Sequence, residues 1–368
     1  MRIAQVSPLY ESVPPRCYGG TERVVSWLTE ELVQMGHEVT LYASGDSVTS
    51  ARLVATCPRS LRLNESSCDQ LAHHLVMLER LKREAHYYDI IHYHCDYMHF
   101  PFSRQIRTPH VTTLHGRLDI PDLVPLYREF SEMVVVSISN AQREPLPWLP
   151  WAGTVHHGLP PDMYELSENA EGYLAFLGRV SPEKGLDRAI RIATRLGWPL
   201  KIAAKVDAAD RRYFEETIKP QLDRPGIEWI GEIAQADKQA FLGNAAALLF
   251  PIDWPEPFGL VMIEAMACGT PVIAFERGSV AEVIEDGVSG YVVRDIDGAV
   301  QAVARIDRLS RRRCRERFER RFVSSRMARE YVKIYESVAG RMTSSDPCVA
   351  GDTPGGSVAG GDGGLRLS

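Results

Sequence analysis

The sequence has no long hydrophobic run and no recognisable leader segment. It contains 368 residues, of which 45% are hydrophobic and 24% are charged. Its most apolar region, residues 245–275, is interrupted by Asp253, Glu256 and Glu264. A membrane-spanning helix needs about 18 or more predominantly apolar residues, so we expect no bilayer span. The first eight residues, Met-Arg-Ile-Ala-Gln-Val-Ser-Pro, lack the apolar core of a secretory signal, which predicts a cytoplasmic protein.

Cysteine and net charge are equally sparse. The seven cysteines are odd in number and scattered, and they form no Cys-x-x-Cys pair, which indicates neither a disulfide framework nor a zinc site. The formal net charge is −6, so the chain lacks the positive field that a nucleic-acid partner requires. What remains is an ordinary globular composition, long enough for two or three domains.

Positive charge is concentrated in one segment, Arg305–Arg341, which holds 13 Lys and Arg against 5 Asp and Glu. Such a run is typical of a solvated helix face. The alternative is a peripheral contact with anionic membrane lipids or with an anionic acceptor.

Short β-branched runs alternate with helical or loop segments along the chain. This alternation predicts the α/β class, with parallel sheets joined by right-handed crossovers. A Pro-rich stretch, Pro145–Asn169, separates two such series and interrupts regular structure, so we predict two Rossmann-like β/α/β domains facing a cleft. The expected strands are Ile3–Val6, Val39–Ala43, Ile90–Tyr93, Val111–Leu114, Val134–Ile138, Leu174–Leu177, Ile202–Ala204, Ile227–Ile230, Leu248–Ile252, Val272–Phe275 and Tyr291–Val293.

The expected domain boundaries follow from this division. The first domain is placed at residues 1–158 and the second at residues 159–322. Residues 323–341 are expected to form a helix that returns to the first domain. Residues 342–368 are rich in Gly, Ser, Asp and Pro with little apolar content, which predicts a disordered tail.

A glycine pair opens the first expected helix. Gly19 and Gly20 precede Thr21, the predicted N-cap, and Gly36 is placed just after the helix end. Paired glycines allow close approach to the backbone, and the N–H groups of a first helical turn suit a phosphate. A tight turn without any ligand is the alternative.

Two cations flank the turn after the first strand of the second series. Arg179 ends Phe-Leu-Gly-Arg, and Lys184 lies in Ser-Pro-Glu-Lys-Gly before the next helix. A bidentate guanidinium beside a mobile ammonium suits a diphosphate. Two solvated surface cations are the alternative.

The segment 251–275 carries the most information. It predicts a strand, a loop, a helix beginning near Phe258 or Gly259, a stop at Gly269 and another strand. Glu264 then lies inside an apolar helix, where a carboxylate needs hydrogen-bond partners. Glu256 lies in the loop before that helix, so both carboxylates can face one ligand. A buried cation paired with Glu264 is the alternative.

These motifs together resemble glycosyltransferase family 4, the retaining GT-B enzymes that use nucleotide-sugar donors. The resemblance covers roughly residues 1–340. It is carried by Gly19-Gly20, by Gly178-Arg-Val-Ser-Pro-Glu-Lys-Gly185, and by Glu256 and Glu264 with seven residues between them.

The resemblance implies roles for particular residues. The first domain would bind the acceptor and the second the nucleotide-sugar, with Gly19 and Gly20 approaching the phosphates. Arg179 and Lys184 would hold the donor diphosphate, and Glu264 would accept from the ribose hydroxyls. Glu256 would hold the transferred sugar together with the backbone around Phe258, Gly259, Leu260 and Val261.

Two further residues are candidates on the acceptor side. His115 lies where the family places a histidine beside the sugar, although a lone histidine can equally be a core residue. Asp96 follows a strand end and is a weaker candidate for the acceptor site. Glu282 is expected to be structural.

The resemblance also implies how the reaction proceeds. The acceptor attacks from the front face of the sugar, which retains the anomeric configuration. The departing diphosphate takes the acceptor's proton, so we name no side-chain base. We expect no cofactor and no metal, because Arg179 and Lys184 would neutralise the diphosphate. Asp295 and Asp297 match a metal-binding Asp-x-Asp by letter, but their place at a helix start favours capping.

The donor is expected to be a UDP-sugar first and a GDP-sugar next, and the hydroxyl acceptor is not readable from the sequence. A GT-B epimerase, a phosphorylase, or a non-catalytic nucleotide-sugar sensor are the competing functions. Product analysis with and without an acceptor separates them.

Overall fold

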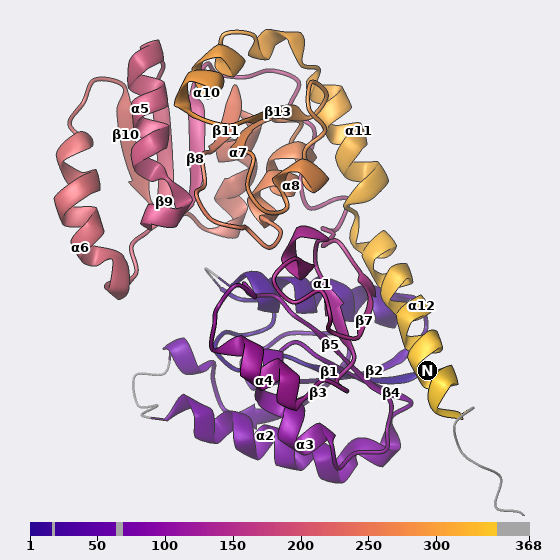
Figure 1. Cartoon of the computed structure of the whole chain (residues 1–368). Coiled ribbons are helices and arrows are strands. Elements are labelled where there is room, and N and C mark those ends of the chain that lie inside the picture. Colours follow the sequence, from indigo (N-terminus) through magenta and orange to yellow (C-terminus); the bar gives the residue numbers. More distant parts are fainter. Residues whose placement is uncertain (17–18, 64–68, 344–368) are drawn as a thin grey trace, which may run out of the picture.

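The computed structural model describes residues 1–16, 19–63 and 69–343 (Figure 1). Two α/β domains, each built on one parallel sheet, lie on either side of a cleft. Most of the predicted tail, residues 344–368, lies outside the described residues, whereas residues 342 and 343 belong to the last helix. None of the described helices combines the length and apolar character needed to cross a bilayer.

The first domain contains a seven-stranded sheet in the order β3-β2-β1-β4-β5-β6-β7, with every neighbouring pair parallel. The order reverses beside β1, where the carboxyl ends of β1 and β4 leave a crevice of the kind that binds ligands in open parallel sheets. Its strands are β1 (Arg2–Val6), β2 (Glu38–Ser44), β3 (Arg52–Cys57), β4 (Ile90–Tyr93), β5 (His110–Thr113), β6 (Val135–Ser137) and β7 (Trp151–Thr154), and its helices are α1 (Gly20–Gln34), α2 (Gln70–Glu84), α3 (Phe100–Ser103) and α4 (Leu123–Glu129).

The second domain contains a six-stranded parallel sheet in the order β10-β9-β8-β11-β12-β13. Its order reverses between β8 and β11, which leaves a second crevice at the carboxyl ends of these strands. Residues beside both crevices line one cleft. Its strands are β8 (Leu174–Arg179), β9 (Leu200–Lys205), β10 (Ile227–Gly231), β11 (Ala247–Phe250), β12 (Val272–Phe275) and β13 (Gly290–Val293), and its helices are α5 (Leu186–Leu196), α6 (Arg211–Tyr213), α7 (Lys238–Gly243), α8 (Leu260–Ala267), α9 (Val280–Val283), α10 (Ile296–Val303) and α11 (Arg311–Arg321).

The two-domain α/β fold predicted from the sequence is confirmed, and each of the eleven expected strands corresponds to a strand of these sheets. Two strands were not expected. β3 has a mixed pattern of buried and exposed side chains, as an edge strand does. β7 lies inside the stretch Pro145–Asn169, where we expected no regular element, because it completes the other edge of the sheet with the four residues that follow Pro150.

One predicted helix start is wrong by two residues. Gly19, not Thr21, is the N-cap of α1, and no side chain caps that end. The helix that carries Glu264 starts next to the predicted position, because Gly259 is its N-cap and Leu260 its first residue. The predicted helix ends hold, because Gly36 and Gly269 both follow their helices with positive φ angles of 84° and 80°.

The last helix, α12 (Ser324–Thr343), lies along the first domain, where it packs against α1, β5 and β7 (Figure 1). Several arginines of the segment 305–341 contact backbone carbonyls within the protein. Arg311 donates to the carbonyls of Ser167, Ala245 and Gly243, and Arg315 donates to those of Tyr164, Ala267 and Pro161. These two side chains therefore tie α11 to the second domain instead of forming a solvated face.

Candidate functional site

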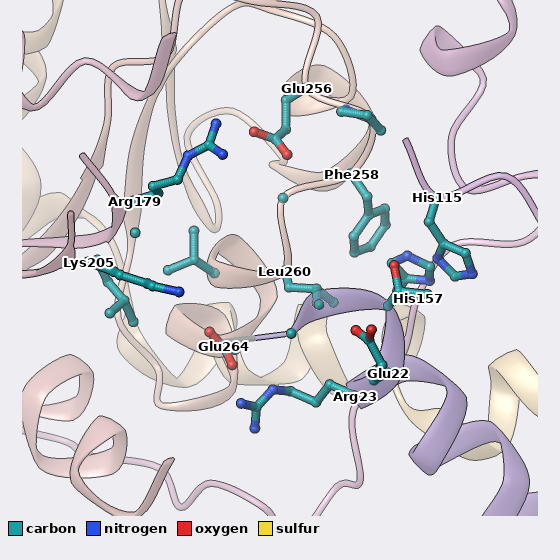
Figure 2. A pocket seen from close by; sticks show the side chains of 18 of the residues that line it. Glu22, Arg23, His115, His157, Arg179, Lys205, Glu256, Phe258, Leu260 and Glu264 are labelled. Carbon is teal, nitrogen blue, oxygen red and sulfur yellow. The ribbon is translucent and has the colours of Figure 1, made fainter. Parts of the chain in front are cut away.

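A cleft of about 480 Å³ lies between the two domains, at the facing crevices of the two sheets. Both domains contribute side chains to it, as Figure 2 shows for Glu22 and His115 on one side and Arg179 and Glu256 on the other. The structure brings together every residue that the sequence singled out for the site: Gly19, Gly20, Asp96, His115, Arg179, Lys184, Glu256, Phe258, Gly259, Leu260, Val261 and Glu264.

Two glycines shape the loop at the start of α8. Gly259 has a φ of 79°, in the left-handed region that favours glycine, and it is the N-cap of the helix. Gly278, with a φ of 52°, packs against the backbone of Glu256, where a Cβ atom would lie 2.5 Å from the Glu256 nitrogen. The loop carrying Glu256 is therefore fixed against a neighbouring turn, and the residues at the start of α8 line the cleft beside it.

Glu256 and Lys184 form an ion pair across the floor of the cleft. Nζ of Lys184 lies 2.5 Å from Oε2 of Glu256, and the indole N–H of Trp254 donates to the same oxygen at 3.0 Å. The Lys184 ammonium also lies 4.7 Å from the centre of the Trp254 ring. The ammonium thus has a carboxylate and an aromatic face as neighbours, both of which attract a cation.

Arg179 is surrounded by carboxylates at longer distances. Its guanidinium lies 3.6 to 3.8 Å from carboxylate oxygens of Glu183, Asp207 and Asp210. Its Nε atom is buried and has no hydrogen-bond partner within the described part of the chain. Because a buried donor without a partner is costly, this guanidinium is suited to an additional anionic partner.

Glu264 is 3% exposed and its Oε1 accepts two hydrogen bonds, from Nζ of Lys238 at 2.7 Å and from the Tyr164 hydroxyl at 3.1 Å. The buried-cation alternative is therefore realised, while the carboxylate also lines the cleft. Burial by itself raises the pKa of Glu264, but the attraction and hydrogen bond of Lys238, together with the charge of Arg23 and the Tyr164 hydroxyl, outweigh burial and bring the pKa below its usual value.

His115 is held by a second histidine behind it. Its Nε2 lies 2.9 Å from Nδ1 of His94, whose Nε2 lies 2.8 Å from Oε1 of Gln5. The Gln5 amide donates to the hydroxyl of Tyr335 on α12 at 3.1 Å. Burial lowers the pKa of His115 to about 3, so the imidazole is neutral at ordinary pH and its ring is oriented by this buried set of bonds.

Asp96 lies in a strained backbone conformation in the same cleft, with a φ of 48°. Burial raises its pKa to about 6, although the backbone N–H of His115 acts in the opposite direction. A carboxyl group that exchanges its proton near neutral pH at a strained position is typical of a functional site.

Four cations of the cleft were missed from the sequence: Arg23, Arg62, Lys205 and Lys238. Lys205 pairs in register with Arg179 on the adjacent strand, so both side chains stand at the carboxyl edge of the sheet. Arg23 lies near the start of α1, three residues after Gly20. The signal for Lys205 is the strand order, which was not available from the sequence. The signal for Arg23 is its position at the start of the helix that faces the cleft.

Residues expected to be structural have structural partners. Asp295 accepts from the backbone N–H of Gly298 at 2.8 Å and caps α10, as the capping interpretation predicts. Asp297 pairs with Arg195 at 2.5 Å. Glu282 accepts from the backbone of Asn140 and Ala141 in the first domain at 2.8 and 2.7 Å.

Two family models match this chain. Residues 18–156 match the model described as Glycosyltransferase Family 4, and residues 165–322 match the model described as Glycosyl transferases group 1. The two matches are separated by residues 157–164 in the linker, and each covers most of the sheet of one domain.

Individual proteins are similar over comparable lengths. An uncharacterized glycosyltransferase of Methanocaldococcus jannaschii is 24% identical over 344 residues, which span 80% of this chain and 85% of that protein. The crystal structure of AviGT4, a glycosyltransferase involved in avilamycin A biosynthesis, superposes with a TM-score of 0.73 at 25% identity, covering 92% of this chain and 98% of that one. Anabaena HepE in complex with UDP and glucose has the same fold, with a TM-score of 0.70 at 17% identity and coverage of 92% and 100%.

Proposed function

Because the chain belongs to glycosyltransferase family 4 and has the GT-B fold, we propose that it transfers a sugar from a nucleoside-diphosphate sugar to a hydroxyl acceptor with retention of configuration. A UDP-sugar is the favoured donor and a GDP-sugar the next. The observation that carries the proposal is the interdomain cleft, in which cations, carboxylates and a helix N-terminus converge on one space.

The donor diphosphate is assigned to the cations of the second domain. Arg179 and Lys205 stand on adjacent strand ends, and Lys184 lies in the turn before α5. A diphosphate leaving group gains charge as the glycosidic bond breaks, so preorganised cations stabilise the transition state more than the bound donor. Gly20, at the start of α1, approaches the same space from the first domain.

The nucleoside and the sugar are assigned to the two carboxylates. Glu264 has one oxygen held by Lys238 and Tyr164, and its other oxygen accepts a ribose hydroxyl. Glu256, with the first N–H groups of α8 between Phe258 and Val261, orients the hydroxyl groups of the transferred sugar. The UDP-bound Anabaena neighbour of the same fold supports a nucleotide in such a cleft.

The acceptor is assigned to the first-domain wall, where Asp96 and His115 meet. Neutral His115 offers a ring nitrogen rather than a charge to a hydroxyl group. The departing phosphate takes the acceptor's proton, and the two domains orient the reactants and exclude water. No separate side-chain base is assigned, and no metal or cofactor is required by this scheme.

The test is product analysis with UDP-, GDP- and ADP-sugars, with and without a panel of sugar, lipid and small hydroxyl acceptors. A transferase releases the nucleoside diphosphate and forms a new glycoside only when its acceptor is present, and NMR of the product shows whether the anomeric configuration is retained. A changed sugar nucleotide formed without acceptor indicates an epimerase. Tight binding of a nucleotide-sugar without turnover against the whole panel supports the non-catalytic sensor.

A further inference from the structure

Four side chains link the first domain to the carboxylate of Glu264. Arg23 on α1 donates from Nη1 to Oε1 of Gln235 at 2.6 Å. Nε2 of Gln235 donates to the Tyr164 hydroxyl at 2.7 Å, and that hydroxyl donates to Oε1 of Glu264 at 3.1 Å. In Figure 2, Arg23 extends from the helix of the first domain toward the side of the pocket that carries Glu264.

The direction of this chain of hydrogen bonds is fixed by its two ends. Arg23 can only donate, so it meets the amide oxygen of Gln235 and leaves the amide nitrogen facing Tyr164. The Tyr164 oxygen accepts from that nitrogen, and its hydrogen is available for Glu264. The ionised carboxylate of Glu264 can only accept. All four groups are therefore satisfied in one arrangement, which depends on Arg23 being in place.

The members come from separate parts of the fold. Arg23 belongs to the first domain, Tyr164 to the linker between β7 and β8, Gln235 to the turn Gln235–Asp237 after β10, and Glu264 to α8. Tyr164 is 2% exposed, so water does not compete for its bond to the carboxylate. Among the described residues that line the cleft, Arg23 and Glu264 are present but Gln235 and Tyr164 are not. The two middle residues thus reach a ligand only through their neighbours.

This chain of hydrogen bonds controls how the Glu264 carboxylate is oriented toward a ligand in the cleft. Tyr164 and Lys238 both bond to Oε1, and they fix the plane of the carboxylate, with Oε2 as the oxygen available to a ligand. When the domains separate, Gln235 loses its charged donor and its amide can turn. The Tyr164 hydrogen is then no longer directed at Glu264, and one of the two donors that orient the carboxylate is lost.

We propose that Arg23 is a positioning residue that couples closure of the two domains to the orientation of Glu264, through Gln235 and Tyr164. The inference rests on the proposed function, in which Glu264 receives a ribose hydroxyl of a nucleoside diphosphate. Coupling between two equilibria is reciprocal. Closure therefore tightens nucleotide binding, and the bound nucleotide stabilises the closed arrangement by the same factor.

Calorimetric titration of the full chain with UDP, GDP and ADP tests this coupling. For the nucleotide that binds wild type most tightly, Tyr164→Phe should weaken binding about tenfold, a typical coupling between sites. Arg23→Gln should weaken it at least as much, and the double variant should bind no more weakly than Arg23→Gln alone. Tyr173→Phe is the matched control and should bind like wild type. The buried Tyr173 hydroxyl donates to the Phe241 carbonyl at 2.8 Å and takes no part in the hydrogen bonds that link Arg23 to Glu264.

Two results would overturn the coupling. Wild-type affinity in Tyr164→Phe with weak binding in Arg23→Gln would mean that Arg23 acts by direct contact with the nucleotide. Strictly additive losses in the double variant would mean that the two residues act independently.

If none of the three nucleotides binds wild type, the proposed function fails, and the coupling is tested by small-angle X-ray scattering without nucleotide. Arg23→Gln should then give a larger radius of gyration than wild type. Arg80→Gln serves as the control, since Arg80 pairs with Glu84 on its own helix. A radius of gyration for Arg23→Gln equal to that of the control would overturn the proposal.

Discussion

Lys184 and Glu256 lie in direct contact, with Nζ 2.5 Å from Oε2, although one was predicted to bind phosphate and the other to bind sugar. Each charge therefore compensates the other in a cleft that would otherwise hold an unpaired carboxylate. In the proposed function, an anionic diphosphate would compete with Glu256 for the ammonium, so donor binding would be linked to the release of Glu256 toward the sugar. The Trp254 indole N–H, 3.0 Å from Oε2, remains as a donor to Glu256 when Lys184 turns away.

Lys184→Ala should therefore reduce catalysis more than donor binding. In the proposed function the ammonium stabilises charge that develops on the leaving group, and removal of one such group typically costs about 10²- to 10³-fold in kcat. Steady-state kinetics with the identified donor and acceptor measure kcat and KM separately. Lys201→Ala, on β9 with its ammonium over the Tyr173 ring, is a control outside the cleft. An unchanged kcat in Lys184→Ala would contradict the assignment.

Glu264→Gln should mainly weaken nucleotide binding, by about tenfold, because a neutral amide is a poorer acceptor for ribose hydroxyls than a carboxylate. The same change leaves the partly buried Lys238 without its counter-ion, so the melting temperature of the unliganded protein should also fall. Titration calorimetry and thermal unfolding separate the two effects. Equal nucleotide affinity in variant and wild type would remove Glu264 from the donor site.

Asp96→Asn should change the stability of the protein in a pH-dependent way. The pKa of Asp96 is raised to about 6 in the folded chain, so between about pH 4 and pH 6 the folded state binds more protons than the unfolded state. The stability contributed by the protonated carboxyl is thus present at low pH and lost as the pH rises through the folded pKa. The difference in melting temperature, variant minus wild type, should therefore increase by a few degrees as the pH rises from 4.5 to 7.5. A difference that stays constant across this range would contradict the raised pKa.

His115 should stay neutral throughout the physiological range, because burial lowers its pKa to about 3. Heteronuclear NMR of the histidine-labelled protein, assigned by loss of the signal in His115→Asn, should show no titration of this ring between pH 5 and pH 8. The same neutrality predicts that no rise or fall of kcat/KM between pH 5 and pH 8 is due to titration of His115. The shape of this pH profile should therefore be the same in wild type and in His115→Asn. A His115 resonance that moves near pH 6.5 is the opposing result.

Thermal unfolding in the presence of nucleotides tests the donor class directly. At 100 times its Kd, a ligand that binds only the folded state adds about 2.7 kcal/mol of stability. UDP is expected to raise the melting temperature by several degrees in EDTA, with GDP next, and Mg²⁺ should add little because protein cations neutralise the diphosphate. A shift seen only with Mg²⁺, or only with NAD, would reject the proposed donor site.

The sequence was sufficient for the fold class and for the motif residues, because their signals are local. Strands such as Ile90–Tyr93 are continuous apolar runs, and the Glu256 to Gly269 segment carries its own helix start and stop. The pairing of Lys184 with Glu256 could not be predicted in the same way. It depends on the turn after β8 and the loop after β11 meeting in space, which the strand order of the sheet decides.

The same limit applies to Arg23, Lys205 and Lys238. Each is a single cation without a motif, and a lone cation is more often a solvated surface group. Lys205 becomes informative only when β9 is known to lie beside β8 in register, and Arg23 only when α1 is known to face the second domain. Side chains that act across the domain interface are thus the part of the site that local patterns miss.

The return of α12 to the first domain makes that domain discontinuous in the chain, with the second domain inserted between its two parts. Tyr331 and Tyr335 are fully buried, and their hydroxyl groups form hydrogen bonds with Thr113 on β5 and Gln5 on β1. On the ribosome, the first domain therefore has its sheet early but its last helix only after the second domain has been synthesised. A protein cut after the second domain would leave the strand contacts of Tyr331 and Tyr335 exposed.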